Sequence, residues 1–237
     1  MLSRAALREE ARGFWSTAGD PSRWGTPPDL VRALHRSRLR LAVEPVDGLR
    51  VATVSARLRA IGAPPWSDPC DRPLRACLVA DQGAGLVLVD RGDAPDEQRF
   101  SVAHEVAHFL VHYLRPRREA LAHFGEPIRD VLDRRRPPTS AERFSAALRD
   151  VPLAPYHHAM ERPGRTRDPR TRAMEAEADD LALEILAPWE EVSALTGDVE
   201  RALVERYGLP AAPARWLACQ IPRDPSVSGV LRLFAKK

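Results

Sequence analysis

The sequence predicts an α+β fold in which a small sheet packs against one helix and a second helix crosses it. Two short apolar segments, 74–80 and 85–90, flank an Asp-Gln-Gly turn and predict a β-hairpin. The segment that follows Asp93 keeps apolar residues at helical spacing as far as Leu114. A third segment, 172–187, shows helical spacing again and ends before a proline. We expect the hairpin and these two helices to form the core.

The N-terminal part predicts a helix that lies apart from this core. Residues 3–15 have a helical pattern that Ser3 can cap, and a Gly/Pro/Ser-rich stretch separates them from a second helical pattern at 28–37. We therefore expect residues 1–27 to form a peripheral helix and linker. The main domain is expected to span 28–222.

Shorter elements complete the expected fold. Residues 39–44 alternate like a strand. Helical patterns recur in five further segments: 51–61, 118–133, 139–149, 198–207 and 212–220. Arg- and Pro-rich loops surround two of them, so we expect 115–172 to be a helical insertion outside the core and 223–237 to be a C-terminal tail.

Composition indicates a globular protein of a reducing compartment. The chain has 237 residues, 44% hydrophobic and 29% charged, which is ordinary for a globular domain. It contains no apolar run of the roughly 18 residues that a membrane span needs, and charges interrupt its N-terminal segment, so we expect neither an anchor nor a signal peptide. Its three cysteines form no CxxC pair. We expect a cytoplasmic protein.

The positive charge is concentrated in one segment. The formal net charge is +3, and residues 115–172 alone hold 14 arginines against eight acidic residues. No helix-turn-helix, zinc-finger spacing or aromatic-interleaved sheet accompanies these arginines. We therefore interpret them as a solvated surface and do not expect direct nucleic-acid binding.

The helix before Leu114 contains His104-Glu105-Val106-Ala107-His108. Two histidines four residues apart lie on one face of a helix, so both imidazoles can bind one metal ion. Glu105 can then take a proton from a zinc-bound water and later deliver it to a leaving amine. The pentapeptide thus predicts a catalytic zinc site with His104 and His108 as ligands and Glu105 as the general base.

A catalytic zinc ion needs a third protein ligand and an open position. The extended pattern HExxHxxGxxH is excluded because the chain has Val111 and Leu114 where it requires glycine and histidine. His112 lies two turns beyond His104, about 12 Å along the helix, and is expected to pack or to form an outer hydrogen bond. Glu175 and Glu177 flank the apolar stripe of the later helix on either side, and geometry leaves both open.

The segments RFSVAHEVAHFLVH and EAEADDLALEILAP, with the hairpin before them, resemble the ImmA/IrrE family of bacterial metallopeptidases across residues 28–210. The family's second helix has the form ExEANxFAxxLLxP. This resemblance implies a zincin-like fold and places the third zinc ligand at Glu177, with Asp179 where the family usually has Asn. An aspartate there can accept a histidine N–H and orient the ring.

The resemblance also implies a function. It implies a zinc-dependent endopeptidase that cuts one protein partner, typically a helix-turn-helix repressor of a mobile element or stress regulon. The substrate backbone is expected to add alongside the strand near 85–90. The alternative is a zinc-containing sensor that binds a partner without efficient turnover. Three neighbouring residues of the insertion are candidates to stabilise the oxyanion: Tyr156, His157 and His158.

Overall fold

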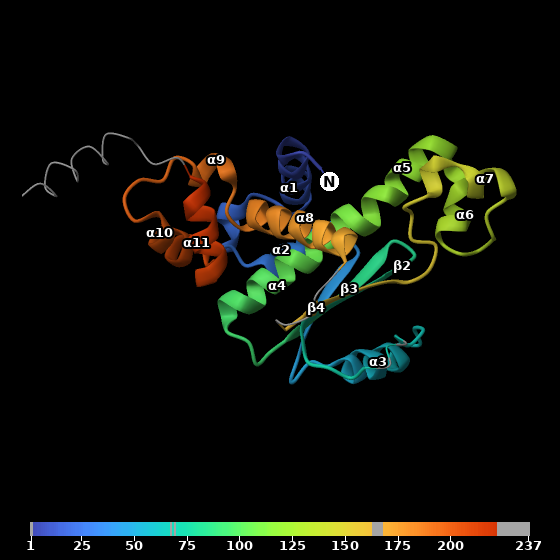
Figure 1. Cartoon of the computed structure of the whole chain (residues 1–237), viewed down its shortest axis with the longest axis horizontal. Helices are drawn as coiled ribbons and strands as arrows, with labels where there is room; N and C mark the ends of the chain where they lie inside the picture. Colours follow the sequence, from blue (N-terminus) through green and yellow to red (C-terminus); the bar gives the residue numbers. More distant parts are fainter. Residues whose placement is uncertain (1, 67, 69, 163–167, 222–237) are drawn as a thin grey trace, which may run out of the picture.

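A four-stranded sheet lies at the centre of the computed structural model, which describes residues 2–66, 68, 70–162 and 168–221 (Figure 1). Its order is β1-β3-β2-β4, with β1 parallel to β3 and the other neighbours antiparallel. The strands have these bounds: β1 Leu41–Val46, β2 Leu74–Asp81, β3 Ala84–Asp90 and β4 Tyr156–Glu161. The pair β2–β3 is the predicted hairpin, which is confirmed.

Strand β4 was not expected from the sequence. It pairs with β2 along its length and comes from the segment 115–172, which was expected to lie outside the core. Its six residues are all partly buried, without the alternation that marks a half-buried strand. Only the pairing with β2, which is distant in sequence, makes the segment a strand.

The helix with the two histidines lies on one face of the sheet. This helix, α4 (Pro95–His108), continues through a π-helical turn, Phe109–Leu114, into α5 (Arg115–Phe124). Helix α8 (Pro169–Leu186) packs across it, as predicted. On this face the sheet contributes five buried side chains to the main core: Leu41, Leu78, Ala80, Val87 and Val89. These observations confirm the expected α+β architecture.

The opposite face of the sheet is covered by α3 (Val51–Ala60), which Figure 1 shows on the other side from α4. The alternate strand residues Cys77, Val79 and Leu88 point to this face and join a separate apolar cluster with α3. Each strand of the hairpin therefore buries both of its faces, which explains its nearly continuous apolar sequence.

The N-terminal helix is not peripheral. Helix α1 (Arg4–Ala18) packs on α8 and buries Leu7, Ala11, Phe14 and Ala18 in the main core. The expectation for residues 1–27 is wrong in this respect, because these four side chains recur at helical spacing and form an apolar stripe. Helix α2 (Leu30–Arg36) packs beside α1 and α4.

The helical part of 115–172 forms a small cluster of its own around α5, at one end of the molecule in Figure 1. The expected helix at 118–133 is interrupted at Gly125, whose φ is 75°, and continues as α6 (Arg129–Leu132). Helix α7 (Ser140–Phe144) begins at the capping box of Thr139 and Glu142.

Three helices end the described chain: α9 Trp189–Val192, α10 Val199–Tyr207 and α11 Ala211–Gln220. The predicted tail, 223–237, lies outside the described residues. Within the described ranges, no helix combines the length and apolar character needed to cross a membrane.

Candidate metal centre

His104 and His108 face each other on consecutive turns of α4. Their Nε2 atoms are 3.1 Å apart, and both side chains are buried. Two nitrogens bound to one tetrahedral zinc ion at roughly 2.0–2.1 Å are about 3.3 Å from each other. The two imidazoles therefore already have the spacing that a shared metal ion requires.

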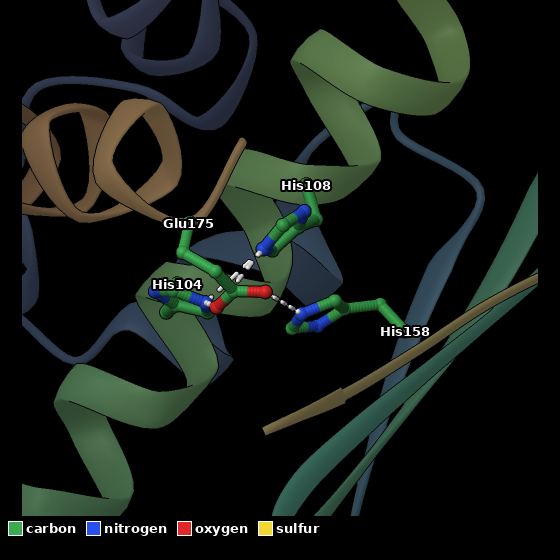
Figure 2. A group of neighbouring side chains, drawn as sticks. All are labelled: His104, His108, His158 and Glu175. Carbon is green, nitrogen blue, oxygen red and sulfur yellow. Dashed lines mark hydrogen bonds and ion pairs between the residues drawn. The ribbon is translucent and has the colours of Figure 1, made fainter. Parts of the chain in front are cut away.

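A carboxylate from α8 completes this group. The Oε2 atom of Glu175 lies 3.3 Å from Nε2 of His104 and 4.0 Å from Nε2 of His108. Figure 2 shows the carboxylate among the rings of His104, His108 and His158. His104, His108, Glu175 and His158 each offer one donor atom, and these four atoms lie within 4.8 Å of one another.

Glu177 does not take the position expected for the third ligand. Its Oε2 atom lies 3.1 Å from Nε2 of His112, and its Oε1 atom accepts the backbone N–H of Leu2. Residues two apart on a helix point about 200° apart, so Glu175 and Glu177 cannot face the same point. The orientation of α8 against α4 turns Glu175 to the imidazole pair, and this corrects the choice of Glu177.

His104 is oriented by Asp179. Its Nδ1 atom lies 2.8 Å from Oδ1 of Asp179. A carboxylate can only accept here, so Nδ1 carries a proton, and Nε2 is the nitrogen that can bind a metal ion once its own proton is lost. This confirms the expectation that an aspartate at this position can accept a histidine N–H.

His108 is oriented by a longer chain of contacts. Its Nδ1 atom lies 2.9 Å from Nδ1 of His112, whose Nε2 atom faces Glu177. Glu177 accepts the Nε2 proton of His112, which leaves Nδ1 of His112 to accept the proton of His108. His108 then keeps its Nε2 lone pair for a metal ion. The outer hydrogen-bonding role expected for His112 is confirmed.

His158 connects the sheet to this site. Its Nδ1 atom lies 2.9 and 3.1 Å from the two oxygens of Glu105, and its Nε2 atom lies 2.8 Å from Oε1 of Glu175. The ring stacks on His108 with a centroid distance of 3.6 Å. His158 was one of three oxyanion candidates, but its contacts with the two glutamates were not predicted, because β4 has no strand pattern in the sequence.

The two neighbours of His158 have different surroundings. The Oη atom of Tyr156 is 3.4 Å from Nδ1 of His108, so this hydroxyl also borders the site. His157 points to the opposite face of the sheet and stacks on Trp66 at 5.7 Å. The strand therefore delivers only alternate side chains to the site.

Burial and charge act against each other in this cluster. Burial lowers the pKa of His104, but hydrogen bonds to Asp179 and Glu175 raise it further, to about 10. Burial raises the pKa of Glu175, whereas His104 and His158 lower it well below its usual range. Burial also lowers the pKa of His112, and Glu177 only partly offsets this effect. In the metal-free site the His104 ring, which faces two carboxylates, is therefore protonated near neutral pH.

Comparison with known families finds a match in the region that carries the two histidines. The IrrE N-terminal-like domain, which defines peptidase family M78, matches residues 75–149. This match supports an ImmA/IrrE-family metallopeptidase. No curated protein matches it. The matched region of this metallopeptidase contains His104, Glu105 and His108, whereas His158 and Glu175 lie beyond its end.

The donor set of the metallopeptidase fits a catalytic metal ion. His104 and His108 offer imidazole nitrogens whose tautomers are set by outer partners, and Glu175 offers a carboxylate oxygen. Two histidines and one glutamate form a known ligand set of catalytic zinc sites. A hydrolase that uses a metal ion is thus supported by both the family and the geometry.

The edge of the sheet near the metal centre is β4. Strand β3 pairs with β1 on one side and β2 on the other, so its backbone cannot accept a further strand. The expectation that a substrate adds alongside 85–90 is therefore wrong. Strand β4 is last in the sheet order and carries His158, which contacts Glu105.

Proposed function

We propose that this metallopeptidase is a zinc endopeptidase that hydrolyses a peptide bond in a specific protein substrate. One observation supports the proposal most directly. The Nε2 atoms of His104 and His108 are 3.1 Å apart, and Oε2 of Glu175 lies 3.3 Å from Nε2 of His104. His104, His108 and Glu175 would hold the ion as three protein ligands. When bound, the ion lowers the pKa of a water molecule and polarises the scissile carbonyl.

Glu105 serves as general base and then as general acid. It follows the ligand His104 on α4 without belonging to the metal-binding group, and its side chain is fully buried. A carboxylate in this position accepts a proton from the attacking water and delivers it to the leaving amine.

The substrate is proposed to bind as an extended segment beside β4. An edge strand offers unpaired backbone groups that an extended peptide can join by β-augmentation. A cavity of about 460 Å³ adjoins the site on the side of His112 and Glu177, with Val111, Arg115 and Met174 also in its walls. This cavity can receive a side chain of the substrate.

The resemblance to the family suggests the class of substrate. We propose a helix-turn-helix transcriptional repressor as the partner and the cytoplasm as the place of action. The three cysteines, Cys70, Cys77 and Cys219, are all free thiols, which agrees with a reducing compartment.

Labelling of new protein N-termini tests the proposed function. Zinc-loaded protein is incubated with a lysate of the source organism, and new N-termini are identified by mass spectrometry. The Glu105→Gln variant at equal zinc loading is the control. We expect one or a few cleavage sites that require Glu105, in a DNA-binding protein. Identical patterns for both proteins would refute peptidase activity.

A further inference from the structure

We propose that His158 is a positioning residue that holds the carboxylate of Glu105 in its reactive orientation. This inference rests on the proposed function, because it assigns a role in the same reaction. His158 comes from β4, outside both the region matched by the family and the two helices that carry the metal-binding residues. Strand β4 thus adds a third histidine, His158, to the residues that α4 and α8 contribute to the site.

The contacts of His158 fix its ring at two points. Nδ1 faces both oxygens of Glu105, at 2.9 and 3.1 Å, and Nε2 faces Oε1 of Glu175 at 2.8 Å. Carboxylates accept hydrogen bonds, so each ring nitrogen donates one. A rotation of the ring breaks at least one of these charge-assisted bonds, and stacking on His108 at 3.6 Å restricts the ring further.

The two oxygens of Glu175 contact different histidines, and this distinguishes His158 from the metal ligands. Oε2 of Glu175 is the oxygen near His104, at 3.3 Å, whereas Oε1 is the oxygen that faces His158. Nδ1 of His158 faces Glu105, which lies outside the metal-binding group, and its Nε2 faces the Glu175 oxygen other than the one near His104. The ring therefore acts as an outer partner that ties the ligand carboxylate to the base.

Glu105 depends on this support. Its side chain has no solvent exposure. Within the described part of the chain, its carboxylate receives hydrogen bonds from His158. Loss of the donor leaves a buried carboxylate without a partner, free to turn its oxygens away from the reacting atoms. Misplacement of a catalytic group by about 1 Å can reduce the rate on the order of 100-fold.

Kinetics of four variants test the role. The substrate is a synthetic peptide that spans a cleavage site found by N-terminal labelling. We expect His158→Ala to lower kcat by about 10- to 100-fold with KM within about twofold and zinc content unchanged. His158→Asn keeps an amide donor near the position of Nδ1 and should recover more activity than His158→Gln. The control, His157→Ala, changes the neighbouring residue on the opposite face of the sheet.

A double-mutant cycle shows whether His158 acts through Glu105. In the Glu105→Gln background, we expect His158→Ala to cost less than about twofold further in kcat, because the group it positions is already disabled. Independent, multiplicative losses would overturn the proposal. Loss of zinc from His158→Ala to the extent seen for His104→Ala would also overturn it, because His158 would then be a ligand.

A spectroscopic measurement separates this inference from the proposed function. In zinc-loaded protein with ¹⁵N-labelled histidine, the Nδ1–H signal of His158 is assigned by its absence from the His158→Ala variant. We expect Glu105→Gln to shift this signal and His157→Ala to leave it in place. A signal unaffected by Glu105→Gln contradicts the inference even if the protein cleaves its substrate. If the wild-type protein cleaves nothing, the proposed function fails, and the NMR result still decides whether His158 holds Glu105.

Discussion

The Nε2 atom of His112 lies 3.1 Å from Oε2 of Glu177, and this pair determines which nitrogen of His108 is available to a metal ion. Because Glu177 accepts the Nε2 proton, His112 presents an unprotonated Nδ1 atom, 2.9 Å from Nδ1 of His108. His108 donates to it and directs its Nε2 lone pair toward His104. Glu177 thus acts on the site through two imidazoles and not by direct ligation.

Replacement of each glutamate on α8 should separate these roles. We expect Glu175→Ala to abolish stoichiometric zinc binding at micromolar zinc, because it removes a proposed ligand. Glu177→Ala should weaken zinc binding only about 10- to 100-fold, as loss of an outer partner does. Competition with a chromophoric chelator measures both affinities. A larger loss for Glu177→Ala than for Glu175→Ala would restore Glu177 as the ligand.

The contact between His104 and Asp179 makes a second prediction. Asp179→Ala removes the acceptor of the His104 Nδ1 proton, so we expect zinc affinity to fall about 10- to 100-fold with the fold retained. The neighbouring Asp180→Ala is the control, because Asp180 lines a different cavity, next to Trp216. Equal zinc affinities of the two variants would argue against an orienting role for Asp179.

Turnover should depend on Glu105 while zinc binding does not. We expect Glu105→Gln to reduce kcat by at least about 100-fold, which is the usual contribution of general acid–base catalysis. Zinc content and thermal unfolding should change little, since Glu105 lies outside the metal-binding group. Cleavage at the wild-type rate would exclude the mechanism and favour a sensor that binds its partner without turnover.

Zinc affinity should rise with pH. The pKa of His104 in the metal-free site is raised to about 10, so this ring is protonated near neutral pH and must lose its proton to bind zinc. We expect zinc binding to release protons, and affinity to fall as pH decreases below about 10. Calorimetry in buffers of different ionisation enthalpy measures this release. Binding without proton release at pH 7 would contradict a protonated His104.

The contact between the sheet and the π-helical turn after α4 leaves no space at Gly85. A Cβ atom there would lie 2.6 Å from Leu41 Cδ1 and 2.9 Å from Phe109 Cε2, so we expect Gly85→Ala to reduce the free energy of unfolding by about 1–3 kcal/mol. Gly13→Ala is the matched control in α1. A Cβ at Gly13 meets nothing within 4 Å, and we expect it to be neutral or stabilising by up to about 1 kcal/mol. Urea unfolding compares the two.

The sequence alone determined the local elements of this protein. The spacing of His104 and His108 on one helix, the hairpin, and the buried stripe of α8 all follow from periodicities within one segment. The ability of Asp179 to accept a histidine N–H was also predictable, because it follows from the residue type at this position of the second motif. The HExxH motif also lies within one continuous segment, and the family match covers that segment.

The tertiary structure decided which distant residues join these elements. Glu175 and Glu177 flank the same apolar stripe, and only the orientation of α8 against α4 turns Glu175 to the histidines. Strand β4 has no alternating pattern of its own, and it exists because β2 pairs with it. His158 therefore reaches Glu105 through a contact between residues 53 apart in sequence. The periodicity of a segment indicates which of its faces is buried. Which distant segment packs against that face depends on the tertiary structure.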